Sequence, residues 1–232
     1  MSKQVLNDDE RKLIRADIYS AEANEETDFT DKKIAFFVKN TLGRNVLDLG
    51  CVDHNESNWK SRYWLHKAIR AGAKKLIGLD YYADGVSKLN AIGFDVMEGD
   101  AQNFNLPDVF DVITAGDLIE HLPDLNGFFN SASKSLCLGG KLVVSTPNPW
   151  CWKYFLYHAL YRKLTPVNKE HVSWFCLQTL ENLSSRFGFE IINYEYSSRR
   201  LYERLAPLPS HLKHTTLCVV FEKVGDAHDQ GN

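Results

Sequence analysis

The stretch NVLDLGC at residues 45–51 decides the fold of this chain. Apolar residues flank one carboxylate, Asp48, and Gly50 ends the apolar run. A short apolar run that ends at glycine is typical of a buried parallel strand followed by a tight turn. Glycine at such a turn lets the backbone approach a ligand where a Cβ atom would block it. The stretch therefore predicts the first strand of a ligand-binding α/β sheet.

Two later apolar runs repeat this pattern. KLIGLD at residues 75–80 ends in Asp80, and the run at residues 94–101 contains Asp100. A helix-sized segment separates the first two runs, so they form a β-α-β unit with a right-handed crossover. Because open α/β sheets bind ligands at the carboxyl ends of their strands, we expect these acids to line a ligand site. Asp80 is well placed to accept hydrogen bonds from two ribose hydroxyls.

The loop after the first strand distinguishes two nucleotide-like ligands. Dinucleotide binding uses G-x-G-x-x-G, which places a pyrophosphate on a helix N-terminus. Residues 50–55 instead read GCVDHN, with a single glycine and an added carboxylate at Asp53. That carboxylate repels a pyrophosphate, whereas S-adenosylmethionine has no phosphate and carries an ammonium group. The loop favours S-adenosylmethionine over NAD.

Strands and helices alternate along most of the chain, which predicts an α/β, doubly wound, mostly parallel sheet. We expect helices at residues 31–42, with Thr30 as N-cap, and at residues 59–71, 84–92, 125–138 and 174–188. We expect the remaining strands at residues 110–116, 141–145, 189–196 and 216–224. His66 lies in a predicted helix, and we interpret it as a packed or surface histidine.

Taken together, these motifs resemble those of class I S-adenosylmethionine-dependent methyltransferases. Asp48 and Gly50 match the acid and the glycine of the family's first motif. Asp80 matches the ribose-binding acid, and Asp100 with Ala101 matches the pair at the adenine edge. The cofactor-binding residues that the resemblance implies are Asp48, Gly50, Cys51, Asp80, Tyr81, Asp100, Ala101 and Gly116.

The later motifs resemble two branches of this family. Glu120-His121, after the fourth strand, is similar to the E-H pair of the ubiquinone-biosynthesis type O-methyltransferases. STPNP at residues 145–149 and NKEH at residues 168–171 resemble a bacterial branch associated with surface-glycan gene clusters. The resemblance implies methylation of a small-molecule or glycan hydroxyl.

The resemblance also implies a domain plan. It covers residues 30–224 and predicts a seven-stranded Rossmann-like methyltransferase sheet that a C-terminal antiparallel hairpin closes. We expect a polar N-terminal arm at residues 1–29, an aromatic insertion at residues 147–170 and a disordered tail at residues 225–232. Val52 departs from the family, because the first motif usually has a second glycine there. A non-catalytic binding subunit and an NAD-type oxidoreductase are the alternative functions.

Two histidines are candidates for the catalytic base. An alcohol is a poor nucleophile, so a general base assists its methylation, and histidine is the commonest choice. His121 follows the fourth strand at the cleft, and His171 enters from the aromatic insertion. Glu120 is a candidate for orienting an imidazole or binding the acceptor. The alternative for both histidines is a packing role.

The aromatic insertion has three interpretations. Trp150, Tyr154, Tyr157 and Tyr161 share one face at helical spacing, with basic residues nearby. The helix packs on the sheet or on a partner subunit, covers the acceptor site as a lid, or makes weak membrane-surface contact through residues 150–163. The spacing does not rank the first two.

Composition and residue spacing limit which partners, cellular compartment and metal sites we expect. The chain has 232 residues with a formal net charge of -3, which predicts no nucleic-acid partner. Its five cysteines are scattered without C-x-x-C pairs, which favours reduced thiols in the cytoplasm. No apolar run reaches membrane-spanning length. No group has metal-ligand spacing in sequence, since Asp53 and His54 lack a third ligand nearby, so we predict no metal.

Overall fold

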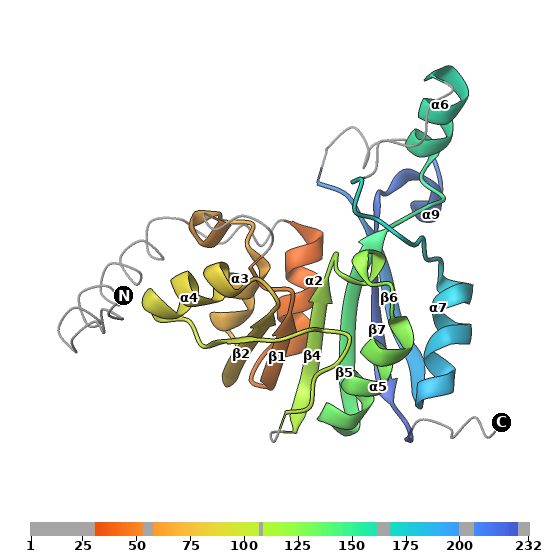
Figure 1. The fold of residues 1–232 in the computed structure, drawn as a ribbon. Helices are drawn as coiled ribbons and strands as arrows, with labels where there is room; N and C mark the ends of the chain where they lie inside the picture. The colour runs from red at the N-terminus through yellow and green to blue at the C-terminus, as the bar shows by residue number, and fades with distance from the viewer. Residues whose placement is uncertain (1–30, 53–57, 107–108, 162–167, 200–206, 227–232) are drawn as a thin grey trace.

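The computed structural model describes residues 31–52, 58–106, 109–161, 168–199 and 207–226. In this part of the chain one seven-stranded sheet has the order β3-β2-β1-β4-β5-β7-β6. The strands are β1 (Asn45–Leu49), β2 (Lys75–Asp80), β3 (Val96–Glu98), β4 (Phe110–Gly116), β5 (Leu136–Pro147), β6 (Phe189–Ser197) and β7 (Thr216–Lys223). Only β7 runs antiparallel to its neighbours β5 and β6. The predicted doubly wound sheet with a C-terminal antiparallel hairpin is confirmed (Figure 1).

Helices flank the sheet on both faces (Figure 1). They are α2 (Lys32–Thr41), α3 (Leu65–Arg70), α4 (Ala83–Ala91), α5 (Leu125–Ser135), α6 (Trp152–Tyr161), α7 (Leu177–Ser184) and α9 (Ser210–Lys213). Single 3-10 turns are η1 (Asn58–Lys60), η2 (Ile119–His121) and η3 (Ser185–Phe187). Two residues separate η2 from the end of β4, and η2 brings Glu120 and His121 to the carboxyl edge of the sheet.

The alternating side chains of the central strands build two separate cores. Leu47 of β1 belongs to an apolar cluster with Phe129 of α5. Its neighbour Val46 points to the other face and packs in a cluster with Phe37 of α2. Because successive strand side chains point to opposite faces, one buried strand serves both layers. β1 and the ligand turn after it are therefore held from two sides.

Helix α2 begins one residue later than predicted. Its N-cap is Asp31, whose Oδ1 accepts hydrogen bonds from the backbone N–H groups of Lys33 and Ile34. An aspartate at this position satisfies N–H groups that have no partner within the helix. The predicted cap, Thr30, lies outside the described residues. The first turn of α2 presents Lys33 at the edge of the sheet.

The predicted helix at residues 59–71 was too long, because α3 begins only at Leu65. Before it, the indole Nε1–H of Trp64 donates to the backbone oxygen of Cys51 at 2.8 Å. Trp64 is buried against α4 and β3 together with Cys51. This tertiary contact holds the segment in an extended turn and delays the start of the helix.

Several other predicted boundaries were also wrong. Helix α5 ends at Ser135 and not at the predicted 138, because Leu136 already pairs with Phe110, so β5 starts at 136 and not at the predicted 141. The predicted third strand, 94–101, is reduced to the three residues of β3. Helix α7 starts at Leu177, later than the predicted 174. Each boundary depends on strand pairing or packing that local periodicity does not show.

Helix α6 stands beyond the edge of the sheet, beside α9 (Figure 1). Trp150 precedes α6, so the predicted single stripe of four aromatic residues on one helix was wrong. Tyr154 packs edge-to-face on Trp174, with ring centroids 5.4 Å apart. Phe155 and Leu160 are 77% and 66% exposed. Part of the insertion, residues 162–167, lies outside the described residues, as does the side chain of Tyr161.

Within the described helices, none combines the length and apolar character needed to cross a membrane. The predicted polar arm at residues 1–29 and positions 227–232 of the predicted tail lie outside the described residues.

Candidate active site

A cavity of about 450 Å³ opens at the carboxyl edge of the sheet. Its volume lies within the usual range for small-ligand sites. Six of the eight predicted cofactor-binding residues line it, and so does one predicted catalytic residue. These residues are Gly50, Asp80, Tyr81, Asp100, Ala101, Gly116 and His121. The structure therefore brings residues from four strands to one site.

Backbone donors hold both oxygens of Asp80 in this cavity. Its Oδ2 accepts a hydrogen bond from the backbone N–H of Val52 at 2.9 Å, and its Oδ1 accepts one from Tyr82 at 3.0 Å. The residue is buried at the end of β2. A carboxylate held by two backbone donors keeps a fixed direction and retains lone pairs for a ligand.

The contact with Asp80 also explains the departure at Val52. The Val52 side chain is buried in an apolar cluster with Trp64 and Val86. Among the described residues other than glycine, only Asp117 has a positive φ, so Val52 needs no left-handed backbone. Valine at this position anchors the turn, and a second glycine is not required for this path. Asp53 and His54 follow it and lie outside the described residues.

Gly50 does require glycine. Its φ is +70°, a left-handed conformation that costs other residues about 1–2 kcal/mol. A Cβ atom there would lie 2.9 Å from Cδ1 of Leu118, which lines the cavity. The glycine therefore satisfies the turn and also keeps Leu118 out of the ligand space.

Asp48 is buried and already bonded on both oxygens. The Thr114 hydroxyl donates to its Oδ1 at 2.6 Å, and Nδ1 of His66 lies 2.9 Å from its Oδ2. His66 is thus packed, in agreement with its prediction. Asp48 and Cys51 line a neighbouring cavity of about 230 Å³, which shares Gly50 with the larger one. Burial raises the pKa of the Cys51 thiol well above its ordinary value, and the charges of Asp48 and Asp80 add to this.

Asp100, Ala101 and Tyr81 form the outer wall of the larger cavity. The Asp100 Oδ1 accepts a hydrogen bond from the backbone N–H of Gln102 at 2.8 Å, while the carboxylate stays exposed. Ala101 is buried beside it. The Tyr81 side chain is 69% exposed at the rim. This wall therefore offers the Asp100 carboxylate as a hydrogen-bond acceptor beside the apolar side chain of Ala101.

Asp117, which the sequence analysis did not select, lies where the cavities meet. Its φ is +49°, and its Oδ2 is 2.6 Å from Nζ of Lys33. The Ser145 hydroxyl donates to its Oδ1 at 2.7 Å. The Asp117 side chain is 45% exposed, and partial desolvation acts to raise its pKa, but the charge and hydrogen bond of Lys33 outweigh this and lower the pKa. For Lys33, burial works to lower the pKa, and Asp117 raises it overall.

A third cavity, of about 350 Å³, adjoins the same residue on the side of α6. It is mostly polar. Its walls are Asp31, Lys33, Asp117, Lys153, Tyr154, Ser197, Arg199, Thr215 and Thr216. Arg199 is anchored there by Asp31, with Nε 2.7 Å from Oδ2. A hydroxyl-rich compound would find donors and acceptors in this cavity.

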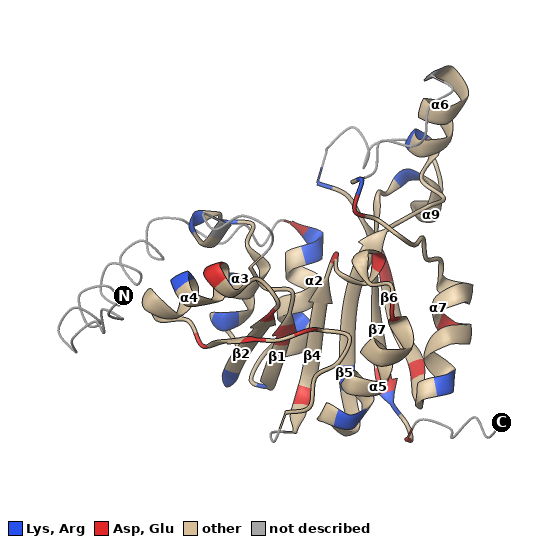
Figure 2. Cartoon of the chain, viewed as in Figure 1, with Lys and Arg blue, Asp and Glu red and all other residues tan. Residues whose placement is uncertain are grey.

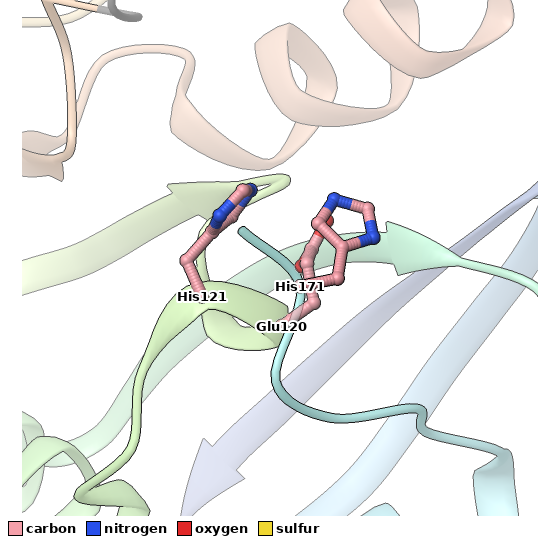
Figure 3. A group of neighbouring side chains, drawn as sticks. All are labelled: Glu120, His121 and His171. Atoms are coloured by element: carbon pink, nitrogen blue, oxygen red, sulfur yellow. The ribbon is translucent and has the colours of Figure 1, made fainter. Parts of the chain in front are cut away.

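The three candidate catalytic residues form one cluster (Figure 3). The rings of His121 and His171 meet edge-to-face, with centroids 4.6 Å apart. The backbone oxygen of Glu120 accepts a hydrogen bond from the backbone N–H of Val172 at 2.8 Å, which ties the 168–173 segment to η2. His121 lines the large cavity.

Burial dominates the electrostatics of this cluster. It raises the pKa of the Glu120 carboxyl to about 8, and the charge of Asp117 adds to the shift, whereas contacts with backbone and with Thr146 oppose it. Burial likewise lowers the pKa of His171, against the charges of Asp117 and Glu170. At neutral pH the cluster therefore tends toward neutral forms of both groups.

Sequence reasoning missed Asp117 and its partners for different reasons. Asp117 directly follows the fourth strand, so the rule that selected Asp80 and Asp100 was sufficient to find it. Lys33 and Arg199 carry no such signal, because they approach the edge only through folding. Basic and acidic positions are interspersed over the described chain (Figure 2), so pairs of this kind do not stand out from composition.

Comparison with known proteins agrees with this geometry. A family model described as a methyltransferase domain matches residues 22–194. A probable S-adenosylmethionine-dependent methyltransferase of Mycolicibacterium smegmatis is 30% identical over 152 residues, which cover 64% of this chain and 53% of that protein. A ubiquinone biosynthesis O-methyltransferase of Aeromonas salmonicida is 27% identical over 126 residues, covering 51% and 48%. The chain thus spans about half the length of these curated relatives.

The fold has a counterpart among solved structures. A SAM dependent methyltransferase from Archaeoglobus fulgidus superimposes with a TM-score of 0.63 at 15% identity, covering 88% of this chain and 98% of that one. The sheet order, the acids at its carboxyl edge and the family match over residues 22–194 agree. The chain belongs to the methyltransferase domain family and has the fold of the class I S-adenosylmethionine-dependent methyltransferases.

Proposed function

We propose that this protein transfers a methyl group from S-adenosylmethionine to a hydroxyl of a carbohydrate or another small hydroxylated acceptor. The observation that carries the proposal is the position of Asp117. It lines the 450 Å³ cavity, which six of the eight predicted cofactor residues also line, and it lines the polar 350 Å³ cavity. A methyl donor in the first cavity and a polar acceptor in the second would meet at this residue.

In this proposal the cofactor lies along the carboxyl edge from β3 to β1. Asp80 accepts hydrogen bonds from the ribose hydroxyls, and Asp100 with Ala101 receives the adenine. Tyr81 closes the adenosine end. The methionine part extends past Gly50 into the smaller cavity, whose wall includes Asp48. The negative charge there favours the cofactor's ammonium group.

The acceptor occupies the polar cavity. Ser197 and Thr216 offer hydroxyls, Arg199 offers donors, and the Tyr154 ring offers a flat apolar face for a sugar ring. Helix α6, which carries Tyr154, then serves as the lid over the acceptor. Membrane contact through residues 150–163 stays a separate prediction, which co-sedimentation with vesicles tests.

Methyl transfer is a direct displacement in which the acceptor oxygen attacks the methyl carbon. The new O–C bond forms as the C–S bond breaks, and its electron pair stays on sulfur, which becomes a neutral thioether. The hydroxyl proton goes to an imidazole of the cluster, His121 or His171, in the simplest scheme. Aligning the two reactants contributes about 7–11 kcal/mol in favourable systems. Likeness to a ubiquinone biosynthesis O-methyltransferase supports oxygen as the methylated atom.

Two measurements test the proposal. Titration calorimetry should show heat with S-adenosylmethionine and none with NAD; the reverse result would favour the oxidoreductase alternative. S-adenosylhomocysteine release is then followed with a panel of free sugars, nucleotide sugars and phenols. Turnover with a sugar hydroxyl is the expected result. Cofactor binding without turnover on any panel member would favour the non-catalytic alternative.

A further inference from the structure

The cluster of Glu120, His121 and His171 has a feature that methyl transfer to a hydroxyl does not require. One ligand-type atom from each of the three side chains lies within 4.8 Å of the other two. Two of these residues come from η2 and the third from the 168–173 segment, which a backbone hydrogen bond joins to η2. The three groups are therefore held together by the fold and not by chance contact of flexible chains.

The Glu120 carboxyl supplies the second observation. Its residue is 1% exposed, and neither carboxyl oxygen has a hydrogen-bond partner of good geometry among the described residues. Leaving a buried polar group without a partner costs about 1–3 kcal/mol, and more when the group is charged. A cation beside two imidazoles would remove this cost. The carboxyl lies in a group that contains both histidines, as Figure 3 shows.

We propose that Glu120, His121 and His171 bind one divalent transition-metal cation, with Zn²⁺ as the best fit. Two imidazole nitrogens and one carboxylate oxygen form a donor set that suits Zn²⁺ and similar ions. Mg²⁺ and Ca²⁺ prefer sites built from oxygen atoms and bind imidazole poorly. Bonds of about 2.0–2.2 Å require ligand atoms about 3.3 Å apart, so modest side-chain rotations close the site.

The function of the cation rests on the proposed methyl transfer, although its binding does not. Three protein ligands leave a position for a substrate oxygen, as in catalytic zinc sites. Because His121 lines the large cavity, an acceptor hydroxyl can reach that position from the site of the methyl donor. Coordination lowers the pKa of the hydroxyl. With a cation bound, both imidazoles act as ligands and not as the base, so the hydroxyl proton leaves to solvent and the oxygen takes the methyl group from sulfur.

The binding test uses untagged, chelator-treated full-length protein and the metal ions alone. Calorimetry with Zn²⁺ should show one ion per chain, and Mg²⁺ should give no heat. Co²⁺ absorption in the visible region reports the ligand set directly. Glu120→Gln and His171→Ala should each weaken Zn²⁺ binding at least tenfold. His211→Ala removes an exposed histidine on α9 and should leave the affinity unchanged.

Circular dichroism melting establishes that each variant is folded, and His171→Gln serves as a second variant if the alanine destabilises the segment. Absence of Zn²⁺ binding by the wild-type protein overturns the proposal. Binding that both Glu120→Gln and the His171 variants retain overturns it as well. S-adenosylmethionine titration of the same variants separates the two proposals. Cofactor binding that persists without Zn²⁺ binding contradicts only the metal site.

Discussion

On the β2–β3 half of the carboxyl edge, backbone N–H groups hold the acids Asp80 and Asp100, whereas on the β4–β5 half the side chains of Lys33 and Ser145 hold Asp117. Asp80 accepts from the N–H groups of Val52 and Tyr82. Asp117 instead depends on Lys33, 84 residues away in sequence. Backbone donors persist through most substitutions, but side-chain partners do not. The half held by backbone donors thus suits the proposed cofactor site, and the half held by side chains suits the proposed acceptor site.

The largest effect should come from Asp80→Ala. Two charge-assisted hydrogen bonds to a ribose are worth about 1.5–3 kcal/mol each, so affinity for S-adenosylmethionine should fall at least about 100-fold. Titration calorimetry measures it. Asp95→Ala, an exposed acid just before β3, is the matched control and should bind normally. Wild-type affinity in Asp80→Ala would mean that the cofactor does not use this half of the edge.

Gly50→Ala should separate backbone strain from ligand space. Gly50 and Gly139 both have positive φ, at +70° and +75°, so alanine at either position should cost about 1–2 kcal/mol of stability. A Cβ atom at Gly139 meets nothing within 4 Å, whereas at Gly50 it would lie 2.9 Å from Cδ1 of Leu118, a residue that lines the cavity. Urea unfolding should show similar losses for the two variants.

Affinity for the cofactor should distinguish the two glycine variants. We expect Gly50→Ala to weaken S-adenosylmethionine binding at least about tenfold, or 1.4 kcal/mol, and Gly139→Ala to leave it unchanged. Equal affinities would contradict the assignment of Leu118 and Gly50 to the cofactor wall.

These two halves also differ in how far sequence reasoning reaches. The turn at Gly50 and the acid Asp80 belong to short local patterns, so their place at the sheet edge was predictable. The end of α5 was not, because Leu136 leaves the helix to pair with Phe110 on another strand. His121 and His171 were both predicted as candidates, but no spacing rule indicates that their rings touch.

The Lys33–Asp117 pair should contribute a smaller, pH-dependent effect. A double-mutant cycle with Lys33→Met and Asp117→Asn should give a coupling of about 1 kcal/mol or less, because the Asp117 side chain is 45% exposed. The pKa of Asp117 is lowered from 3.8, so the coupling should be present above that pH and be lost as the pH falls through the folded value. The pKa of Lys33 is raised from 10.5, so the coupling should also be lost as the pH rises beyond it.

Lys39 and Glu195 provide the control for this cycle. Their charged atoms are 4.0 Å apart and both side chains are well exposed, so their coupling should be close to zero. Urea unfolding at several pH values measures both cycles. A coupling at Lys33–Asp117 no larger than the control would show that this half of the edge is not held by the pair.

The smallest expected effect is on the alkylation rate of Cys176. This residue is the N-cap of α7 and follows the segment that carries His171. Burial acts to raise its pKa, but hydrogen bonds from the backbone and hydroxyl of Thr179 outweigh it and lower the pKa. A lowered pKa gives more thiolate at neutral pH, so iodoacetamide should modify Cys176 before the similarly exposed Cys137. Burial raises the pKa of Cys218 to about 12, so that thiol should react later than Cys176 and Cys137.

Peptide mass spectrometry after timed labelling measures these rates. The labelling covers about pH 6 to pH 9, a range that includes the ordinary thiol pKa of about 8.5. Because its pKa is lowered, the Cys176 rate should level off below the ordinary thiol pKa. Thr179→Val removes the hydroxyl donor while it keeps the backbone, and it should slow the labelling of Cys176 alone. If Cys137 reacts first, the start of α7 is not held as described. The 168–173 segment next to it would then be less firmly placed than the cofactor half of the edge.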